Sequence, residues 1–300
     1  MSTYTDASLI VTPNAKKAGK LYALKGADLD VVRATTATYV GSDGLIKTAL
    51  ANEVRFDYTN GSCPSILVEP QRTNLLLRSE EFNNASWSKI NSITQINTTI
   101  SPTGNLTADT FNLSNVGENL YSLYQVGITS SSLTNTFSIY VKYTNRRYIQ
   151  LTWGSGFSTN FANFDLITGT ITGGTYLDAK INNSYDGFFR IYITTTGIST
   201  NISPYIWPID TFNAPRASTS NGIGSYILFG AQLEAGTNAT SYIPTVASTV
   251  TRNADVISKT GLSGITSITE TFENGTTNVI SGSPTSYTMS QGRIKHVIGI

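Results

Sequence analysis

The sequence of 300 residues predicts an all-β protein built around a β-sandwich. Short runs of alternating apolar and polar residues recur between residues 74 and 245, with turn signals between them. No apolar period of 3.6 residues is sustained there over about 11 residues, as an amphipathic helix would require. Tyrosine and phenylalanine are abundant, at 16 and 12 residues, and aromatic side chains favour strands.

The clearest strand covers residues 136–143. Phe137, Ile139 and Val141 share one face there, while Tyr140 lies on the other, because side chains alternate along a strand. In the next run, residues 148–153, Ile149 and Leu151 point one way and Tyr148, Gln150 and Thr152 the other. Similar runs follow at 160–166, 169–172, 188–194, 205–209 and 226–233. Many short strands of this kind are typical of a sandwich or jelly-roll.

The flanking regions predict different structures. Residues 1–73 alternate short apolar pieces with turn signals, which indicates an extended N-terminal arm with short strands, although these could equally be the first strands of the sandwich. Asn60-Gly61 predicts a hairpin or tight turn. Residues 246–300 predict a linker and a small β-rich C-terminal segment. Its apolar end, residues 293–300, is expected to be a strand of that segment or an oligomer contact.

Composition excludes several classes of function. Twenty basic and nineteen acidic residues give a net charge of +1, so we expect no nucleic-acid partner. No stretch approaches about 18 apolar residues, so no membrane insertion is expected. The start of the chain lacks the pattern of a signal peptide, which predicts synthesis in a cytosol. The single cysteine, Cys63, excludes an intrachain disulfide.

Several phrases of the sequence occur in a fixed order, at residues 33–46, 54–58, 63–87, 230–245 and 250–255. Their joint order resembles fibre, spike and decoration proteins of tailed bacteriophages, which are built around a jelly-roll like that of carbohydrate-binding modules. The resemblance implies three parts. An attachment arm would span residues 1–73, a jelly-roll 74–245, and a linker with a small C-terminal segment 246–300.

The resemblance also implies a function. We expect a non-enzymatic virion protein, a head fibre or capsid decoration, made in the cytoplasm of the bacterial host and located on the virion surface, on the head in preference to the tail. Its expected partners are phage capsid proteins, further copies of itself with a trimer favoured over a dimer, and host surface glycans bound weakly. The alternatives are a tail-associated receptor-binding protein that recognises host polysaccharide and, less favoured, a polysaccharide-degrading spike.

An aromatic platform is the first candidate site, because a sugar ring needs a flat aromatic face with hydrogen-bonding groups nearby. The candidate sugar-binding residues are Tyr140, Tyr148, Gln150, Trp153, Tyr192 and Trp207. Asn160, Asn163 and Asp165 could add hydrogen bonds. The favoured alternative is that these aromatic residues fill the sandwich core or pack against a sister subunit.

Metal and catalytic sites are weaker predictions. The resemblance implies a structural calcium at Glu80, Glu81, Asp109 and Glu234, against the favoured alternative of a solvated edge. No other cofactor is expected. Glycoside hydrolysis needs two carboxylates, but no spacing singles out a pair among Asp165, Asp178, Asp186 and Asp210. His296 and Cys63 are interpreted as structural, so no catalytic residue is predicted.

Overall fold

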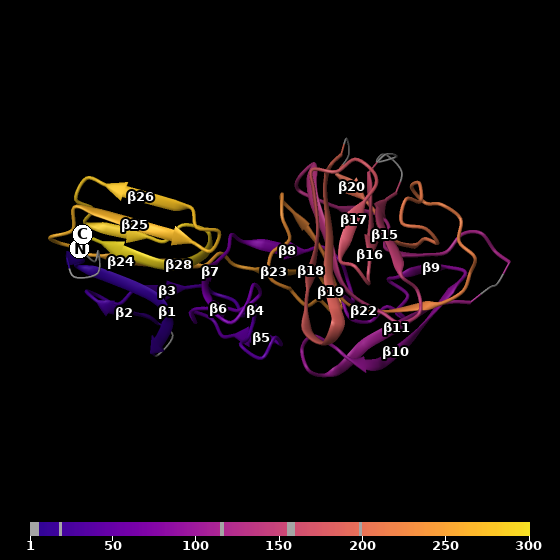
Figure 1. The fold of residues 1–300 in the computed structure, drawn as a ribbon, viewed down its shortest axis with the longest axis horizontal. Coiled ribbons are helices and arrows are strands. Elements are labelled where there is room, and N and C mark those ends of the chain that lie inside the picture. The colour runs from indigo at the N-terminus through magenta and orange to yellow at the C-terminus, as the bar shows by residue number, and fades with distance from the viewer. Residues whose placement is uncertain (1–5, 18–19, 115–116, 155–159, 198–199) are drawn as a thin grey trace. The chain divides into compact units, whose positions relative to one another are not determined.

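The computed structural model describes residues 6–17, 20–114, 117–154, 160–197 and 200–300. The chain divides into two compact units, and Figure 1 labels many of their elements. Unit 1 combines Met1–Arg72 with Arg252–Ile300, and unit 2 is the continuous stretch Thr73–Thr251. Within the described ranges the named elements are strands apart from one short 3-10 helix, η1 (Tyr185–Gly187), which confirms the all-β prediction. No helix in these described ranges is long and apolar enough to span a membrane.

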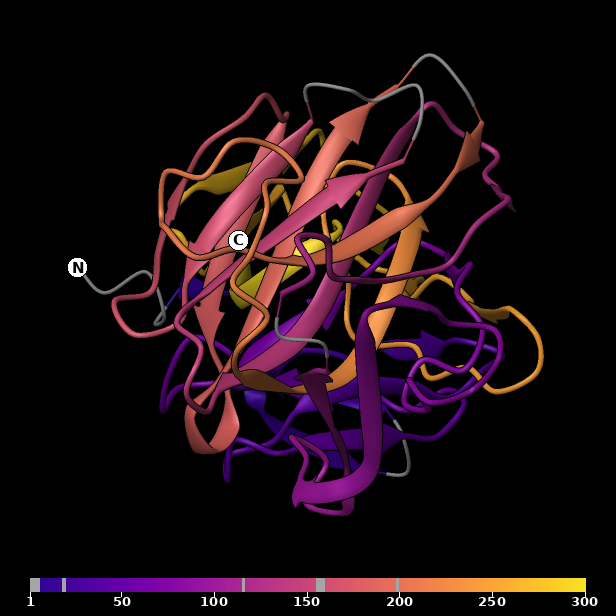
Figure 2. The ribbon, with the colours of Figure 1, turned by 90° about the vertical axis from the view of Figure 1, so that its right-hand side faces the viewer.

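Unit 2 is a sandwich of two six-stranded sheets, seen from a second direction in Figure 2. The β14 sheet has the order β10 (Ser92–Ile100), β11 (Leu106–Leu113), β22 (Ser225–Ala235), β14 (Thr134–Tyr143), β19 (Phe188–Thr196), β18 (Asp178–Asn183). The β15 sheet has the order β17 (Thr170–Thr172), β16 (Phe161–Asp165), β15 (Tyr148–Trp153), β21 (Pro204–Pro208), β12 (Ser122–Tyr124), β9 (Ser88–Ile90). All pairings within them are antiparallel, and the chain passes repeatedly from one sheet to the other, as in a jelly-roll. Two short ribbons accompany them, β13 (Ile128–Thr129) with β20 (Asn201–Ile202) and β8 (Arg72–Asn74) with β23 (Val250–Arg252).

The core of unit 2 lies between these two sheets. Phe137, Ile139 and Val141 of β14 are fully buried in it, opposite Ile149 and Leu151 of β15. The alternation read from the sequence is therefore confirmed for both strands. Each such side chain contributes roughly 1.5–3 kcal/mol by leaving water.

Unit 1 has its own core between further sheets. The larger sheet has the order β2 (Lys20–Lys25), β1 (Leu9–Lys17), β28 (Gly292–Gly299), β25 (Ser267–Phe272), β26 (Thr277–Ser281), with β7 (Ser65–Val68) also on β28 and β6 (Phe56–Asp57) on β7. A second sheet has the order β27 (Ser286–Thr288), β24 (Val256–Thr260), β3 (Asp30–Val32). The hairpin of β4 (Ala37–Val40) and β5 (Ile46–Ala49) completes the unit.

The prediction of a separate extended arm is wrong for the described residues from position 6 onward. Strand β1 pairs with β28, so that Leu9 lies opposite Gly299 across almost the whole sequence. Leu9 and Val11 are fully buried in one core with Ile268 and Val297 from the other end of the chain. The core of unit 1 is therefore built jointly from the two ends of the chain.

The C-terminal strand β28 is therefore an internal strand and not a free edge. It pairs with β1 and β7 along one side and with β25 along the other. The turn expected at Asn60-Gly61 lies between β6 and β7, where Phe56 pairs with Ile66 and Asp57 with Ser65. The hairpin prediction is thus confirmed.

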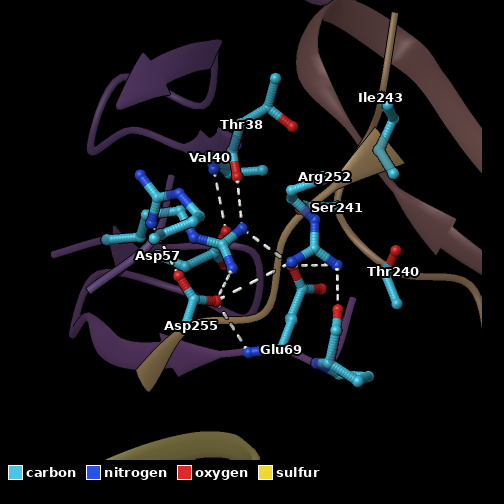
Figure 3. Close-up of polar contacts among 12 residues, drawn as sticks. Thr38, Val40, Asp57, Glu69, Thr240, Ser241, Ile243, Arg252 and Asp255 are labelled. Carbon is cyan, nitrogen blue, oxygen red and sulfur yellow. Dashed lines mark hydrogen bonds and ion pairs between the residues drawn. The ribbon is translucent and has the colours of Figure 1, made fainter. Parts of the chain in front are cut away.

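A buried ionic network holds the two segments of unit 1 together (Figure 3). Its members are Arg33, Arg55 and Glu69 from the first segment and Arg252 and Asp255 from the second. Arg33 Nη1 lies 2.7 Å from Asp255 Oδ1, and Arg55 Nη1 lies 2.8 Å from Glu69 Oε2. Arg55 Nη2 also donates to Asp255, which accepts the amide of Glu69 at 2.9 Å.

Three guanidinium groups thus share two carboxylates inside the protein, and backbone carbonyls take up the remaining donors. Arg33 donates to the carbonyls of Leu50 and Glu53, and Arg252 to that of Pro70 at 2.8 Å. Burying a charge without a partner is costly, so each buried arginine and carboxylate of this network needs its ion pairs and hydrogen bonds for unit 1 to be stable. These arginines and carboxylates lie in the phrases at 33–46, 54–58, 63–87 and 250–255, so that part of the resemblance reflects the folding of unit 1.

Candidate functional site on the outer face of the β15 sheet

The outer face of the β15 sheet is partly covered by the segment 210–220. Gln150 of β15 and Asn163 of β16 hold this segment with their side chains. Gln150 Nε2 donates to the carbonyl of Pro215 at 3.2 Å, and its Oε1 accepts the amide of Ala217 at 2.8 Å. Asn163 Nδ2 donates to the carbonyl of Ala214 at 2.8 Å. Both amides, which we expected to bond a sugar, are therefore occupied by the protein itself.

Aromatic side chains on this face pack against the same segment. The Tyr148 ring stacks on Phe212, with ring centroids 5.8 Å apart. The guanidinium carbon of Arg147 lies 5.1 Å from the centroid of the Tyr148 ring. Trp207 is only 8% exposed, and its Nε1 donates to the carbonyl of Ser218 at 2.9 Å. Tyr148 stays half-buried, whereas Trp207 offers little surface to a ligand.

Beyond the covering segment, one row of side chains crosses four strands. Register places Tyr124 of β12 beside Tyr205 of β21, then Thr152 of β15 and Phe161 of β16. The Tyr124 and Tyr205 rings are stacked, with centroids 4.3 Å apart and planes at 11°. Both rings and Phe161 are half-buried, so each keeps an accessible part. We call Tyr124, Tyr205 and Phe161 the aromatic row.

Arg216 of the covering segment borders the aromatic row. Its Nη2 donates to the carbonyl of Trp153, the residue paired with Pro204 next to Tyr205. Burial and the neighbouring Tyr124 hydroxyl raise the pKa of Tyr205, and the positive charge of Arg216 opposes that rise. The row therefore combines apolar ring faces with a cation at its edge.

The other predicted aromatic residues lie elsewhere, so the expected single platform does not form. Trp153 is fully buried in the sandwich core, because its strand continues the inward alternation of Ile149 and Leu151. Tyr140 and Tyr192 belong to the opposite sheet and are 4% and 6% exposed. The burial of these side chains agrees with the alternative that assigned the aromatic residues to packing.

The segment after β22 covers the outer face of the β14 sheet. Tyr242 contacts Tyr140 and Phe229, with ring centroids 6.2 and 5.4 Å apart. Gln232 Oε1 accepts the amide of Ile243 at 2.6 Å. The residues of the phrase 230–245 therefore serve largely to fix this covering segment on its sheet.

The four residues considered for calcium are engaged in protein contacts. Glu234 is fully buried and accepts the amide of Thr240 at 3.0 Å, and Asp109 accepts the amides of Phe82 and Asn97. Glu80 accepts the Tyr242 hydroxyl at 2.9 Å, while Glu81 pairs with Arg78. Burial raises the pKa values of Glu80, Asp109 and Glu234. In the part of the chain that the structure describes, no group of three or more histidine, cysteine or acidic residues could hold a metal ion.

The carboxylates considered for catalysis are dispersed among structural partners. Asp165 accepts two bonds from Arg147 at 2.8 and 2.7 Å, which holds its pKa well below the usual range, opposite to what a general acid needs. Asp178 accepts the Tyr192 hydroxyl at 2.8 Å. Asp186 pairs with Lys142, and Asp210 with Arg146. Outside unit 2, His296 lies half-buried in β28, where burial lowers its pKa, and Cys63 is exposed.

Sequence reasoning missed Tyr124, Tyr205 and Arg216. A signal for Tyr205 was present, since Tyr205-Ile-Trp207 alternates and places both aromatic residues on one face. Tyr124 follows Leu123 in a strand of only three residues, too short for a pattern. Arg216 lies in a loop, where no periodicity applies.

Comparison with known proteins adds little. No family model matches the chain, and no curated protein matches it. Among solved structures, the chain is similar to the CBM22-1–GH10 modules of Clostridium thermocellum endo-1,4-beta-D-xylanase 10B complexed with xylohexaose, with 12% identity, a TM-score of 0.32, and coverage of 60% of this chain and 30% of that one. It is also similar to the CBM22-2 xylan-binding domain of Paenibacillus barcinonensis Xyn10C, with 12% identity, a TM-score of 0.33, and coverage of 55% and 98%. These likenesses are distant, and the all-β sandwich assignment rests on the strand topology described above.

Proposed function

We propose that this protein is a non-catalytic, sugar-binding protein of a tailed-bacteriophage virion, and that unit 2 binds a sugar ring on the aromatic row. The observation that carries the binding site is the stacked, half-buried pair of Tyr124 and Tyr205 on the outer face of the β15 sheet. The apolar C–H face of a sugar packs against such a ring, and the tyrosine hydroxyls offer hydrogen bonds at its rim.

The surroundings of the aromatic row favour binding over catalysis. Hydrolysis of a glycosidic bond needs two carboxylates on either side of it, one of them with a raised pKa. Near this face, Asp165 forms an ion pair with Arg147, and Asp210 forms one with Arg146, so both carboxylates are already engaged. Binding on a rigid strand scaffold, with no proton transfer, is the simpler use of this surface.

The virion setting is supported by the ordered phrases of the sequence, which resemble bacteriophage fibre and decoration proteins. In our proposal the protein is a head fibre or capsid decoration and unit 1 is its attachment unit. Several copies joined as a trimer would turn weak sugar contacts into useful avidity. The alternative is a tail-associated receptor-binding protein that uses the same aromatic row.

Binding is tested by calorimetric titration against a panel of soluble polysaccharides, both neutral and acidic. We expect at least one polymer to bind, and Tyr205→Ala or Tyr124→Ala to weaken it about tenfold, which corresponds to about 1.4 kcal/mol. Tyr143→Ala is the matched control, because Tyr143 is 39% exposed on the β14 sheet, away from the row. Absence of binding, or equal affinity in all variants, would refute the proposed site.

The virion setting is tested by labelling purified phage particles with an antibody to this chain. Label over the head supports the decoration protein, whereas label confined to the tail supports the receptor-binding alternative. Intact particles that carry no label would refute both.

A further inference from the structure

Arg216 is a guanidinium at the edge of the aromatic row that has no acidic partner among the described residues. The other two arginines close to this face are neutralised, Arg146 by Asp210 and Arg147 by Asp165. No Asp or Glu side chain of the described chain lies within 4.0 Å of Arg216. The undescribed stretches 115–116, 155–159 and 198–199 contain no acidic residue in their sequence.

The fold holds Arg216 in place from both sides. The carbonyl of Pro215 and the amide of Ala217 are both bonded to the Gln150 side chain, at 3.2 and 2.8 Å. Ala217 has φ of 51°, a left-handed conformation that costs a residue with a side chain roughly 1–2 kcal/mol. The Gln150 bond therefore maintains a backbone shape that the segment would not adopt alone, and this shape directs Arg216 across the end of β15.

The side chain of Arg216 is only partly satisfied where it lies. Its Nη2 donates to the carbonyl of Trp153, which is the one hydrogen bond that this side chain makes to the described residues. A cation in this state, beside ring faces that suit a sugar, lacks the counter-charge that Arg146 and Arg147 possess. A guanidinium binds carboxylate oxygens in pairs, with bonds stronger than those between neutral groups.

From this arrangement we infer that the ligand of the aromatic row is an acidic sugar, a ring that bears a carboxylate as in a hexuronic acid. The ring would pack on Tyr205, and its carboxylate would bind Arg216 at the edge. This inference rests on the proposed sugar-binding function and narrows it to one class of polysaccharide.

The test uses the 300-residue protein and four polysaccharides that contain uronic acids: polygalacturonate, alginate, hyaluronan and glucuronoxylan. Each is titrated beside a carboxyl-reduced counterpart, in which the acid has become a neutral hydroxymethyl group. We expect at least one acidic polymer to bind 10- to 100-fold more tightly than its reduced form, the range of a charge-assisted bond. Arg216→Gln should abolish that preference by lowering the affinity for the acidic polymer to about that for its reduced form.

Two controls separate recognition from general charge effects. Lys180→Gln removes the same charge from the edge strand β18 of the opposite sheet, where Lys180 is well exposed, and should keep the preference. Arg216→Lys keeps the charge but not the paired donors, so it should retain only part of the preference. An unchanged melting temperature of Arg216→Gln would show that the covering segment is intact.

The outcomes distinguish this inference from the proposed function. Equal affinity for acidic and reduced polymers, or a preference that survives in Arg216→Gln, overturns the acidic-sugar inference. Binding confined to neutral polysaccharides and dependent on Tyr205 also overturns it, while the proposed function stands. If no polysaccharide of either panel binds, the proposed sugar-binding function fails, and the inference fails with it.

Discussion

Removing the carboxylate of Asp255 should destabilise unit 1 selectively. This side chain is 2% exposed, and it accepts bonds from Arg33 at 2.7 Å, from Arg55, and from the amide of Glu69 at 2.9 Å. In Asp255→Ala, three buried guanidinium groups would share the single carboxylate of Glu69. Breaking a buried ion pair from one side costs about 3–5 kcal/mol, because the remaining charge stays desolvated. For a unit of this size, we expect a fall in melting temperature of roughly 12–20 °C.

The assay can follow the two units separately. All three tryptophans, Trp87, Trp153 and Trp207, belong to unit 2, so tryptophan fluorescence follows that unit while calorimetry records both. We expect the calorimetric transition of unit 1 to move and the fluorescence midpoint to stay. Asp30→Ala is the control, since it removes an ion pair with Lys20 whose side chains are 57% and 50% exposed, and it should change little. If Asp255→Ala shifts no transition more than this control does, the argument from burial is wrong.

Two further predictions concern Glu234, which binds the segment after β22 in unit 2, and the N-terminal part of unit 1. Burial raises the pKa of Glu234, so its contribution to stability is present at low pH and is lost as pH rises through the folded pKa. Glu234→Gln should therefore gain stability relative to the wild type as the pH rises above the ordinary range of a glutamate, about pH 4, measured as the difference in melting temperature. A difference that is independent of pH would contradict this. Deleting residues 1–60 removes β1 together with Arg33 and Arg55, so we expect limited proteolysis to cleave residues 252–300 while tryptophan fluorescence of unit 2 keeps its midpoint. Continued protection of residues 252–300 would instead show that they fold alone.

The strand pattern of unit 2 could be predicted because side-chain alternation is a local property. Phe137, Ile139 and Val141 had to share a face whatever the rest of the chain does, and that face proved to be the core. The same reasoning placed Tyr148 and Gln150 together on the outer face. It could not predict that residues 210–220 would occupy Gln150, because that contact joins residues more than sixty positions apart.

An outward-pointing side chain is not always accessible, which bears on two of the candidate sugar-binding residues. Tyr140 and Tyr192 do point away from the core, yet Tyr242 packs on Tyr140, and Asp178 binds the Tyr192 hydroxyl. The more accessible pair, Tyr124 and Tyr205, comes together only when β12 and β21 become neighbours in the sheet. Which strands pair across a long stretch of sequence depends on how the whole sandwich packs.

The amino-acid sequence by itself determined the all-β class, the alternation within strands and the turn at Asn60-Gly61, because each follows from side-chain and backbone preferences within a few residues. Only the tertiary structure decided that β1 pairs with β28, that Arg33 meets Asp255, and that Arg216 borders the aromatic row. These contacts depend on which distant segments share a core. The partner of a buried charge is set by the packing of distant segments, so it cannot be predicted from local sequence preferences.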